Sequence, residues 1–154
     1  MFKRILVPVD GSSTSNRGLE QALALARSHD ATILLLHVVD EHVIVQHAEA
    51  VAAVTDQYLE SMRASGREVL ARARAAAERQ GVTSRTLLVE NITGSVADIV
   101  VEQARKQRAD VIVMGTHGRR GVKRLVMGSD AEGVVRASPV PVLLVRGGTR
   151  RRSL

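Results

Sequence analysis

Five short apolar runs are spaced along this chain, and most of them are almost free of polar residues. A continuous apolar run of this length is typical of a strand that is buried on both faces of a parallel sheet. We therefore predict strands at residues 4–10, 32–39, 82–89, 111–114 and 142–145. The third run contains Arg85 and Thr86, which indicates a less buried strand near an edge of the sheet.

Helical patterns separate these strands. After the first strand, apolar residues recur at the three- and four-residue spacing of a helix, at Leu19, Ala22, Leu23 and Ala26. A second helical pattern covers about residues 46–80 and is rich in Ala, Arg and Glu. We expect an interruption of this helix at Ser65-Gly66 and its end at Gly81, because glycine commonly terminates helices.

Two capping-box patterns predict the starts of two further helices, Ser95-x-x-Asp98 and Ser129-x-x-Glu132. The inward positions predicted for them are Val96, Ile99, Val100 and Ala104 in the first and Ala131, Val134 and Val135 in the second. Strands that alternate with helices imply βαβ units with right-handed crossovers. The fold class predicted is a single doubly wound α/β domain, with a largely parallel sheet and helices on both faces.

Composition limits the class of protein. The chain has 154 residues, of which 45% are hydrophobic, and we expect one domain over residues 1–147 followed by a basic, disordered tail at 148–154. The absence of cysteine excludes disulfides and thiolate metal sites. No apolar stretch has the length of a membrane span or of a signal sequence, so we expect a cytoplasmic protein.

The formal net charge of +6 favours anionic partners, although part of this excess belongs to arginines in the tail. The only aromatic residues are Phe2 and Tyr58. Proteins that bind single-stranded nucleic acid stack its bases on aromatic side chains, so this composition argues against such a partner.

Glycine, acidic and histidine residues follow three of the predicted strands, in the segments 8–11, 37–40 and 114–118. Ligands of open α/β sheets bind beyond the carboxyl ends of the strands. The most specific pattern is Gly115-x2-Gly118-x9-Gly128-Ser129, whose last pair precedes a predicted helix. A helix N-terminus attracts anions, so this spacing indicates a phosphate site, unless the segment is a flexible loop in which Ser129 only caps the helix.

Cationic residues lie between these glycines, at Arg119, Arg120, Lys123 and Arg124. Arginine and lysine here could neutralise a polyphosphate. The segment is neither a P-loop nor a Gly-x-Gly-x-x-Gly fingerprint, because the required residues do not follow the glycines.

The same residues resemble the universal stress protein family over nearly the whole chain, up to about Arg146. Segments 3–12, 37–39, 109–118 and 138–145 are similar to its hallmarks, and the glycine spacing matches its ATP-binding branch. The resemblance implies strand order 3-2-1-4-5 and an ATP-binding, stress-response or regulatory protein with its nucleotide between strands one and four.

The resemblance also implies a set of nucleotide-binding residues: Pro8, Val9, Asp10, Val38, Met114, Gly115, Gly118, Arg119, Gly128, Ser129, Asp130 and Ala131. In this set Val38 would contact adenine, and the residues from Gly128 onward would bind the phosphates. Mg2+ could bridge the phosphates, but no residue set for a metal is visible, and His29, His42 and His47 lack zinc spacing.

Asp130 departs from the family, which more often has a small apolar residue at this position. An acid in the first turn suits the helix dipole but repels a triphosphate. Asp130 could therefore point outward, bind a metal ion or weaken the affinity.

No pair of nucleophile and base is recognisable, so we favour a binding protein over an enzyme, with weak ATP hydrolysis at most. The alternatives are a slow ATPase or phosphotransfer protein, and a basic nucleic-acid or scaffold protein that binds no nucleotide. We expect His37 to have a structural role in its strand, whereas His117 could contact phosphate or face solvent.

The last strand predicts an assembly. Pro139 and Pro141 suit the entry to an edge strand, because proline cannot donate hydrogen bonds to a neighbour. The outer edge of the sheet would then be apolar and exposed to water, at Val142, Leu143 and Leu144, and such an edge is normally covered. The family resemblance implies a homodimer through this strand, and the alternative is a monomer whose helices shield it.

Overall fold

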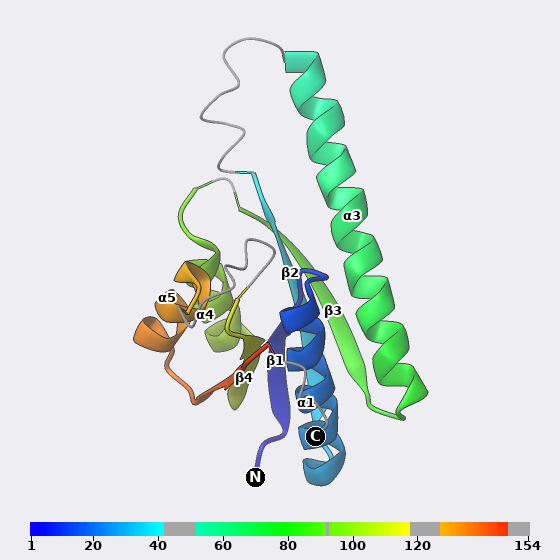
Figure 1. The fold of residues 1–154 in the computed structure, drawn as a ribbon, viewed down its shortest axis with the longest axis vertical. Helices are drawn as coiled ribbons and strands as arrows, with labels where there is room; N and C mark the ends of the chain where they lie inside the picture. The colour runs from blue at the N-terminus through cyan, green and yellow to red at the C-terminus, as the bar shows by residue number, and fades with distance from the viewer. Residues whose placement is uncertain (42–51, 92, 118–126, 148–154) are drawn as a thin grey trace, which may run out of the picture.

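The computed structural model describes residues 1–41, 52–91, 93–117 and 127–147 (Figure 1). Its elements are β1 Arg4–Pro8, α1 Ser13–His29, β2 Thr32–Asp40, α3 Ala52–Arg79, β3 Ser84–Asn91, α4 Val96–Lys106, β4 Val111–Gly115, α5 Ser129–Ala137 and β5 Val142–Val145. The tail at 148–154 and the start of the predicted long helix at 46–51 lie outside the described residues.

The five strands form one parallel sheet in the order β3-β2-β1-β4-β5. This arrangement confirms the predicted fold class and strand order. The first crossovers carry the chain from β1 outward to β3, and the later ones carry it from β4 outward to β5. The order therefore reverses between β1 and β4, where ligands bind in doubly wound sheets.

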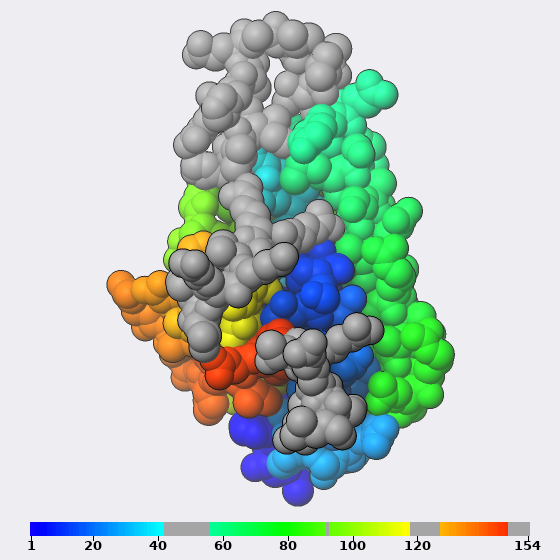
Figure 2. Space-filling model, in the orientation of Figure 1, coloured from blue at the N-terminus to red at the C-terminus, as the bar shows by residue number. Residues whose placement is uncertain are grey.

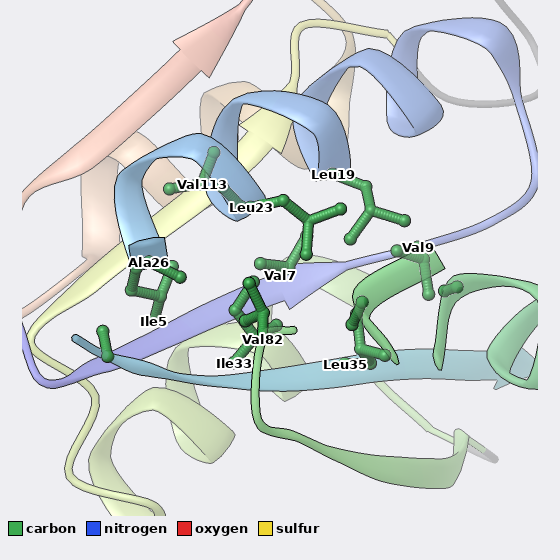
Figure 3. Close-up of a cluster of buried hydrophobic side chains, with 14 of the residues drawn as sticks. Ile5, Val7, Val9, Leu19, Leu23, Ala26, Ile33, Leu35, Val82 and Val113 are labelled. Carbon is green, nitrogen blue, oxygen red and sulfur yellow. The ribbon is translucent and has the colours of Figure 1, made fainter. Parts of the chain in front are cut away.

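The helices α1 and α3 cover one face of the sheet (Figure 3). Ile5 and Val7 of β1 and Ile33 and Leu35 of β2 point to this face and are fully buried. The predicted inward positions of α1, Leu19, Ala22, Leu23 and Ala26, are all buried against these strands. In Figure 2, α3 forms one long side of the molecule, and α5 and β5 lie on the opposite side.

The helices α4 and α5 cover the other face, against Leu6 and Ile112. In α5, Ala131 and Val134 are buried as predicted, but Val135 is 45% exposed, so its predicted inward position is wrong. Successive helix residues are about 100° apart around the axis, and α5 contacts the core along a narrow stripe that Val135 misses. In α4, Val100 and Ala104 are buried, whereas Val96 and Ile99 are half-buried.

The boundary between α3 and β3 differs from the prediction. The amide of Val82 donates to the carbonyl of Ala77, and Gly81 has φ +67°. Val82 therefore belongs to the C-terminal cap of α3, and β3 begins two residues later, at Ser84. The predicted end of the helix at Gly81 is confirmed, because this left-handed backbone suits glycine.

The predicted interruption at Ser65-Gly66 is wrong, because α3 is continuous through it. Gly66 is buried, and a Cβ atom placed on it would lie 2.6 Å from Cδ2 of His37 and 2.9 Å from Cδ1 of Leu88. At this position α3 lies so close to β2 and β3 that only glycine fits. Gly66 is therefore explained by packing and not by helix termination.

We expect Gly66→Ala to lower the free energy of unfolding by about 1–2 kcal/mol, because the new methyl group overpacks the contact with His37. Helix propensity alone predicts the opposite sign, a gain of up to about 1 kcal/mol. Urea unfolding measures the difference. The matched control is Ser65→Ala, the exposed neighbour in the same helix, which should be neutral or stabilising; a stabilised Gly66→Ala would contradict the packing argument.

Asp110, the residue before β4, joins the amino terminus to the sheet. Its carboxylate oxygen Oδ2 accepts hydrogen bonds from the amides of Lys3 and Arg4, both at 2.8 Å. These bonds, the first of them above all, hold the pKa of Asp110 below its ordinary value, and the positive charge of Arg4 acts in the same direction.

The stability that Asp110 contributes should therefore depend on pH. A carboxylate whose pKa is lowered by folding stabilises the protein above its unfolded pKa, roughly 3.9, and loses this effect as the pH falls through the folded value. We expect Asp110→Asn to cost about 1 kcal/mol at pH 7, and the difference from wild type to shrink in acid. Urea unfolding across this range checks it, with the exposed Asp56→Asn as control; a pH-independent difference would contradict it.

Candidate functional site

The carboxyl end of β1 is held rigidly by β2. The amide of Val9 donates to the carbonyl of Leu36 at 2.8 Å, and Nδ1 of His37 lies 2.7 Å from the carbonyl oxygen of Val9. The carbonyl can only accept, so this ring nitrogen carries the proton. His37 is 7% exposed, which agrees with the structural role expected for it.

Asp10 forms the turn between β1 and α1. Its Oδ1 accepts from the amide of Ser12 at 2.8 Å, and its own amide donates to the hydroxyl of Ser15 at 3.1 Å. Gly11 in this turn has φ +80°, a conformation that favours glycine. Ser12 caps α1 by accepting from the amide of Ser15. The half-buried carboxylate of Asp10 thus positions the first turn of α1 at the sheet edge.

Three of the expected site residues share one face of the sheet. Leu6 faces α4 and α5, and Pro8 stands two residues further along β1, so it faces the same way. Val38 stands two residues beyond Leu36, the residue that pairs with Pro8. Met114 packs in the same cluster from β4. Pro8, Val38 and Met114 therefore form an apolar floor at the carboxyl ends of three neighbouring strands.

Gly115 ends β4 and has a packing role. A Cβ atom on it would lie 2.9 Å from the backbone carbonyl of Thr14, and one on Gly18 would lie 3.2 Å from the amide nitrogen of Gly115. The start of α1 thus rests directly on the end of β4. Gly118 and Arg119, together with Arg120, Lys123 and Arg124, lie outside the described residues.

The N-terminus of α5 lies beside this floor. The amide of Gly128 donates to the carbonyl of Thr116 at 2.8 Å, which joins the helix to the end of β4. Gly128 is the N-cap, so the predicted capping box at Ser129 is wrong: Ser129 is already helical, and Glu132 pairs with Arg136 at 2.7 Å instead. Among the described residues no side-chain hydrogen bond caps this end of α5.

The first turn of α5 therefore presents backbone amides that a ligand can use. Ser129 and Asp130 are exposed, and Ala131 is 2% exposed because it anchors the helix in the core. The positive end of the helix dipole lies here, together with the acidic residues Asp130 and Glu132. An anion at this end would gain from the amides and the dipole, and these acids oppose it.

His117 provides a further polar group near the site. Its Nδ1 is hydrogen-bonded to the hydroxyl of Thr116 at 2.9 Å. Its Nε2 is buried and has no partner among the residues that the structure describes. The ring is therefore not simply facing solvent. A buried polar atom without a partner is costly, which points to an occupant.

Thr14, Gly18 and Thr116 were not among the residues predicted for the site. Gly18 lies inside a helical pattern, where glycine lowers the stability of the helix. A glycine at this position was therefore the signal in the sequence that another part of the backbone lies close to the helix. Thr116 precedes a histidine in a glycine-rich segment, and nothing local distinguishes it.

Asp40 and Glu41, two neighbouring acids at the end of β2, have structural roles. Glu41 is 3% exposed and pairs with Arg63 at 3.1 Å, and Arg63 also pairs with Glu90 at 2.6 Å. The hydrogen bond to Glu90, above all, raises the pKa of Arg63. Asp40 accepts from the side-chain amide of Asn91 at 3.2 Å. Both acids thus tie β2 to its neighbours.

The described part of the chain contains neither a metal-binding cluster nor a membrane-spanning helix. No group of three or more His, Asp or Glu residues there is placed to hold a metal ion. None of its helices is long and apolar enough to cross a membrane.

Comparison with known proteins identifies the family. Residues 1–146 match the model of the universal stress protein family. Universal stress protein MJ0531 of Methanocaldococcus jannaschii is 34% identical over 146 residues, which cover 95% of this chain and 83% of the relative. A universal stress protein family structure from Burkholderia pseudomallei is 33% identical, with TM-score 0.77 and coverage of 94% and 96%. The structure of protein MJ0577 is 26% identical, with TM-score 0.85 and coverage of 97% and 99%.

More distant structures share the fold and contain nucleotides. A universal stress protein in complex with cAMP is 23% identical, with TM-score 0.65 and coverage of 94% and 97%. A family member from Arabidopsis thaliana with AMP bound is 20% identical, with TM-score 0.69 and coverage of 98% and 95%. The protein from Archaeoglobus fulgidus in complex with dAMP is 18% identical, with TM-score 0.68 and coverage of 94% and 98%.

The fold, the match over nearly the whole sequence and these relatives lead to one conclusion. This chain belongs to the universal stress protein family.

Proposed function

We propose that this protein binds an adenine nucleotide, ATP in the first place, at the carboxyl ends of β1 and β4, and acts as a regulatory protein. The observation that carries the proposal is that an apolar surface and a polar surface lie side by side at the carboxyl ends of the strands. Pro8, Val38 and Met114 form an apolar floor, and the uncapped N-terminus of α5 begins beside it.

Each part matches one part of a nucleotide. A purine base is flat and apolar on its faces, so it gains from burial against the floor. Phosphates gain from the amides of the first turn, from Ser129 to Ala131, and from the helix dipole. Nε2 of His117, which is buried without a partner among the described residues, adds a polar atom that would bond to the nucleotide.

Two further observations support an adenine nucleotide. The spacing from Gly115 to Ser129 resembles that of the ATP-binding branch of the family, and structures with this fold contain cAMP, AMP and dAMP. A divalent cation would then be held mainly by the phosphates, because a cluster of acidic ligands is missing from the described residues.

The phosphate end can be tested with Ser129→Glu. A carboxylate in the first turn suits the helix dipole and should not lower the melting temperature, but it repels phosphate. We expect ATP to bind at least roughly tenfold more weakly, a loss of about 1.4 kcal/mol, while adenosine binding changes little. Isothermal titration calorimetry measures both.

The matched control is Ser61→Glu, which adds the same charge on an exposed position of α3 and should leave ATP binding unchanged. Equal affinity of wild type and Ser129→Glu for ATP would contradict a phosphate site at α5. A wild type that binds neither ATP nor AMP would contradict the proposed function itself.

We also propose that the protein is a homodimer joined through β5. Among the described residues β5 pairs only with β4, so its outer edge has unpaired backbone groups. Val142 and Leu144 are half-buried against the α4–α5 side of the core, whereas Leu143 is 43% exposed. Leu143 is therefore the residue of the proposed interface that can be changed at the least cost to the fold.

We expect Leu143→Lys to convert the dimer to a monomer, because each interface would gain two facing charges on an apolar strand. Sedimentation velocity at micromolar concentration measures the mass. The matched control is Val135→Lys on α5, where the native side chain is 45% exposed, and it should remain dimeric. A monomeric wild type, or a dimer that survives Leu143→Lys, would contradict this assembly.

A further inference from the structure

A hollow lies at the amino ends of the strands, at the opposite end of the sheet from the proposed nucleotide site. Its volume is about 240 Å³, and it opens beside the amino ends of β1, β2 and β3 and the end of α4. The side chains that matter to the argument are Arg4, Leu6, Thr32, Leu34, Arg85 and Gln107.

Strand register brings these side chains to one face. Arg4 is paired with Thr32, and Leu34 is paired with Arg85. Residues that pair directly across parallel strands point to the same face, as do residues two apart in one strand. All four therefore lie on the α4–α5 face, to which Leu6 also points.

The hollow exists because α4 covers this part of the sheet incompletely. On the α1–α3 face, Ile33 and Leu35 of β2 are fully buried. On the α4 face, Leu34 and its neighbour Leu87 are only half-buried. Of the large apolar side chains that line the hollow, Leu34 thus remains partly open to water, and burying it would be favourable.

The rim of the hollow carries the positive charges of Arg4 and Arg85, of which Arg4 also acts on the carboxylate of Asp110. Among the described residues neither Arg4 nor Arg85 forms an ion pair with a carboxylate. Asp110 is the nearest candidate for Arg4, and its Oδ2 is already bound by the backbone amides of Lys3 and Arg4. Gln107 adds an uncharged amide at the end of α4.

We propose that this hollow binds a small carboxylate with an apolar tail. The guanidinium groups of Arg4 and Arg85 would bind the carboxylate, since arginine recognises it with paired hydrogen bonds. The tail would cover Leu34, which is half-buried in the hollow. An apolar lining with a few polar groups that fix orientation is typical of small-molecule sites.

Octanoate is the probe for the wild-type protein. Its titration should shift the NMR amide signals of Thr32, Gln107 and Ala109, and leave those from Gly128 to Ala131 in place. Octanol lacks the charge and acetate lacks the tail, so each should bind roughly tenfold more weakly or worse. Adding octanoate to protein saturated with ATP should give the same shifts, which separates this site from the proposed nucleotide site.

Two single variants test the arginines. We expect Arg4→Gln and Arg85→Gln each to weaken octanoate binding roughly tenfold, because each removes one charged donor. The matched control is Arg105→Gln, an exposed position of α4 outside the hollow, which should bind as wild type does. All three positions are exposed, so the variants should fold, and thermal unfolding checks this.

Several outcomes would overturn the proposal. If octanol bound as tightly as octanoate, the hollow would be only an apolar surface. If acetate bound as tightly, it would be only an anion site. Octanoate shifts centred on α5, unchanged affinity in both arginine variants, or no binding at millimolar concentration would each exclude the site.

Discussion

The position of β1 at the centre of the sheet is the constraint on which the rest of the structure depends. Because β1 pairs with both β2 and β4, its central residues Ile5, Leu6 and Val7 are buried on both faces and must be apolar. From β1 the chain first forms β2 and β3 on one side of the sheet, and it then returns to form β4 and β5 on the other side. The crossover helices of the two halves therefore lie on opposite faces of the sheet. The edge where the carboxyl ends of β1 and β4 meet is therefore left without a crossover above it, which is the origin of the candidate site.

Close backbone contacts then determine the shape of that edge. Gly18 and Gly115 allow the start of α1 to rest on the end of β4, and Gly128 allows α5 to begin beside Thr116. Each of these three glycines is explained by local packing. Together they allow the starts of α1 and α5 to lie at the end of β4. The apolar floor and the free amides of α5 are thus products of how the layers pack.

The strands could be predicted from the sequence because burial on both faces leaves an unbroken apolar run. The errors have one cause, which is that a local pattern does not contain its tertiary neighbour. Gly66 resembles a helix breaker until His37 is seen against it, and Val82 resembles a strand residue until its bond to Ala77 is seen. In the site, the family resemblance indicated Pro8, Val38 and Met114, but their common face follows only from the register.

The pairing of Arg63 with both Glu41 and Glu90 has a consequence for the motions of the molecule. Glu41 is buried, so moving α3 away from the sheet would leave its carboxylate without a cation, at a large cost. The backbone bond from Glu41 to Asn91 lies within the same unit. Amide protons at the ends of β2 and β3 should therefore exchange with solvent only when this part of α3 opens with them, as one cooperative segment.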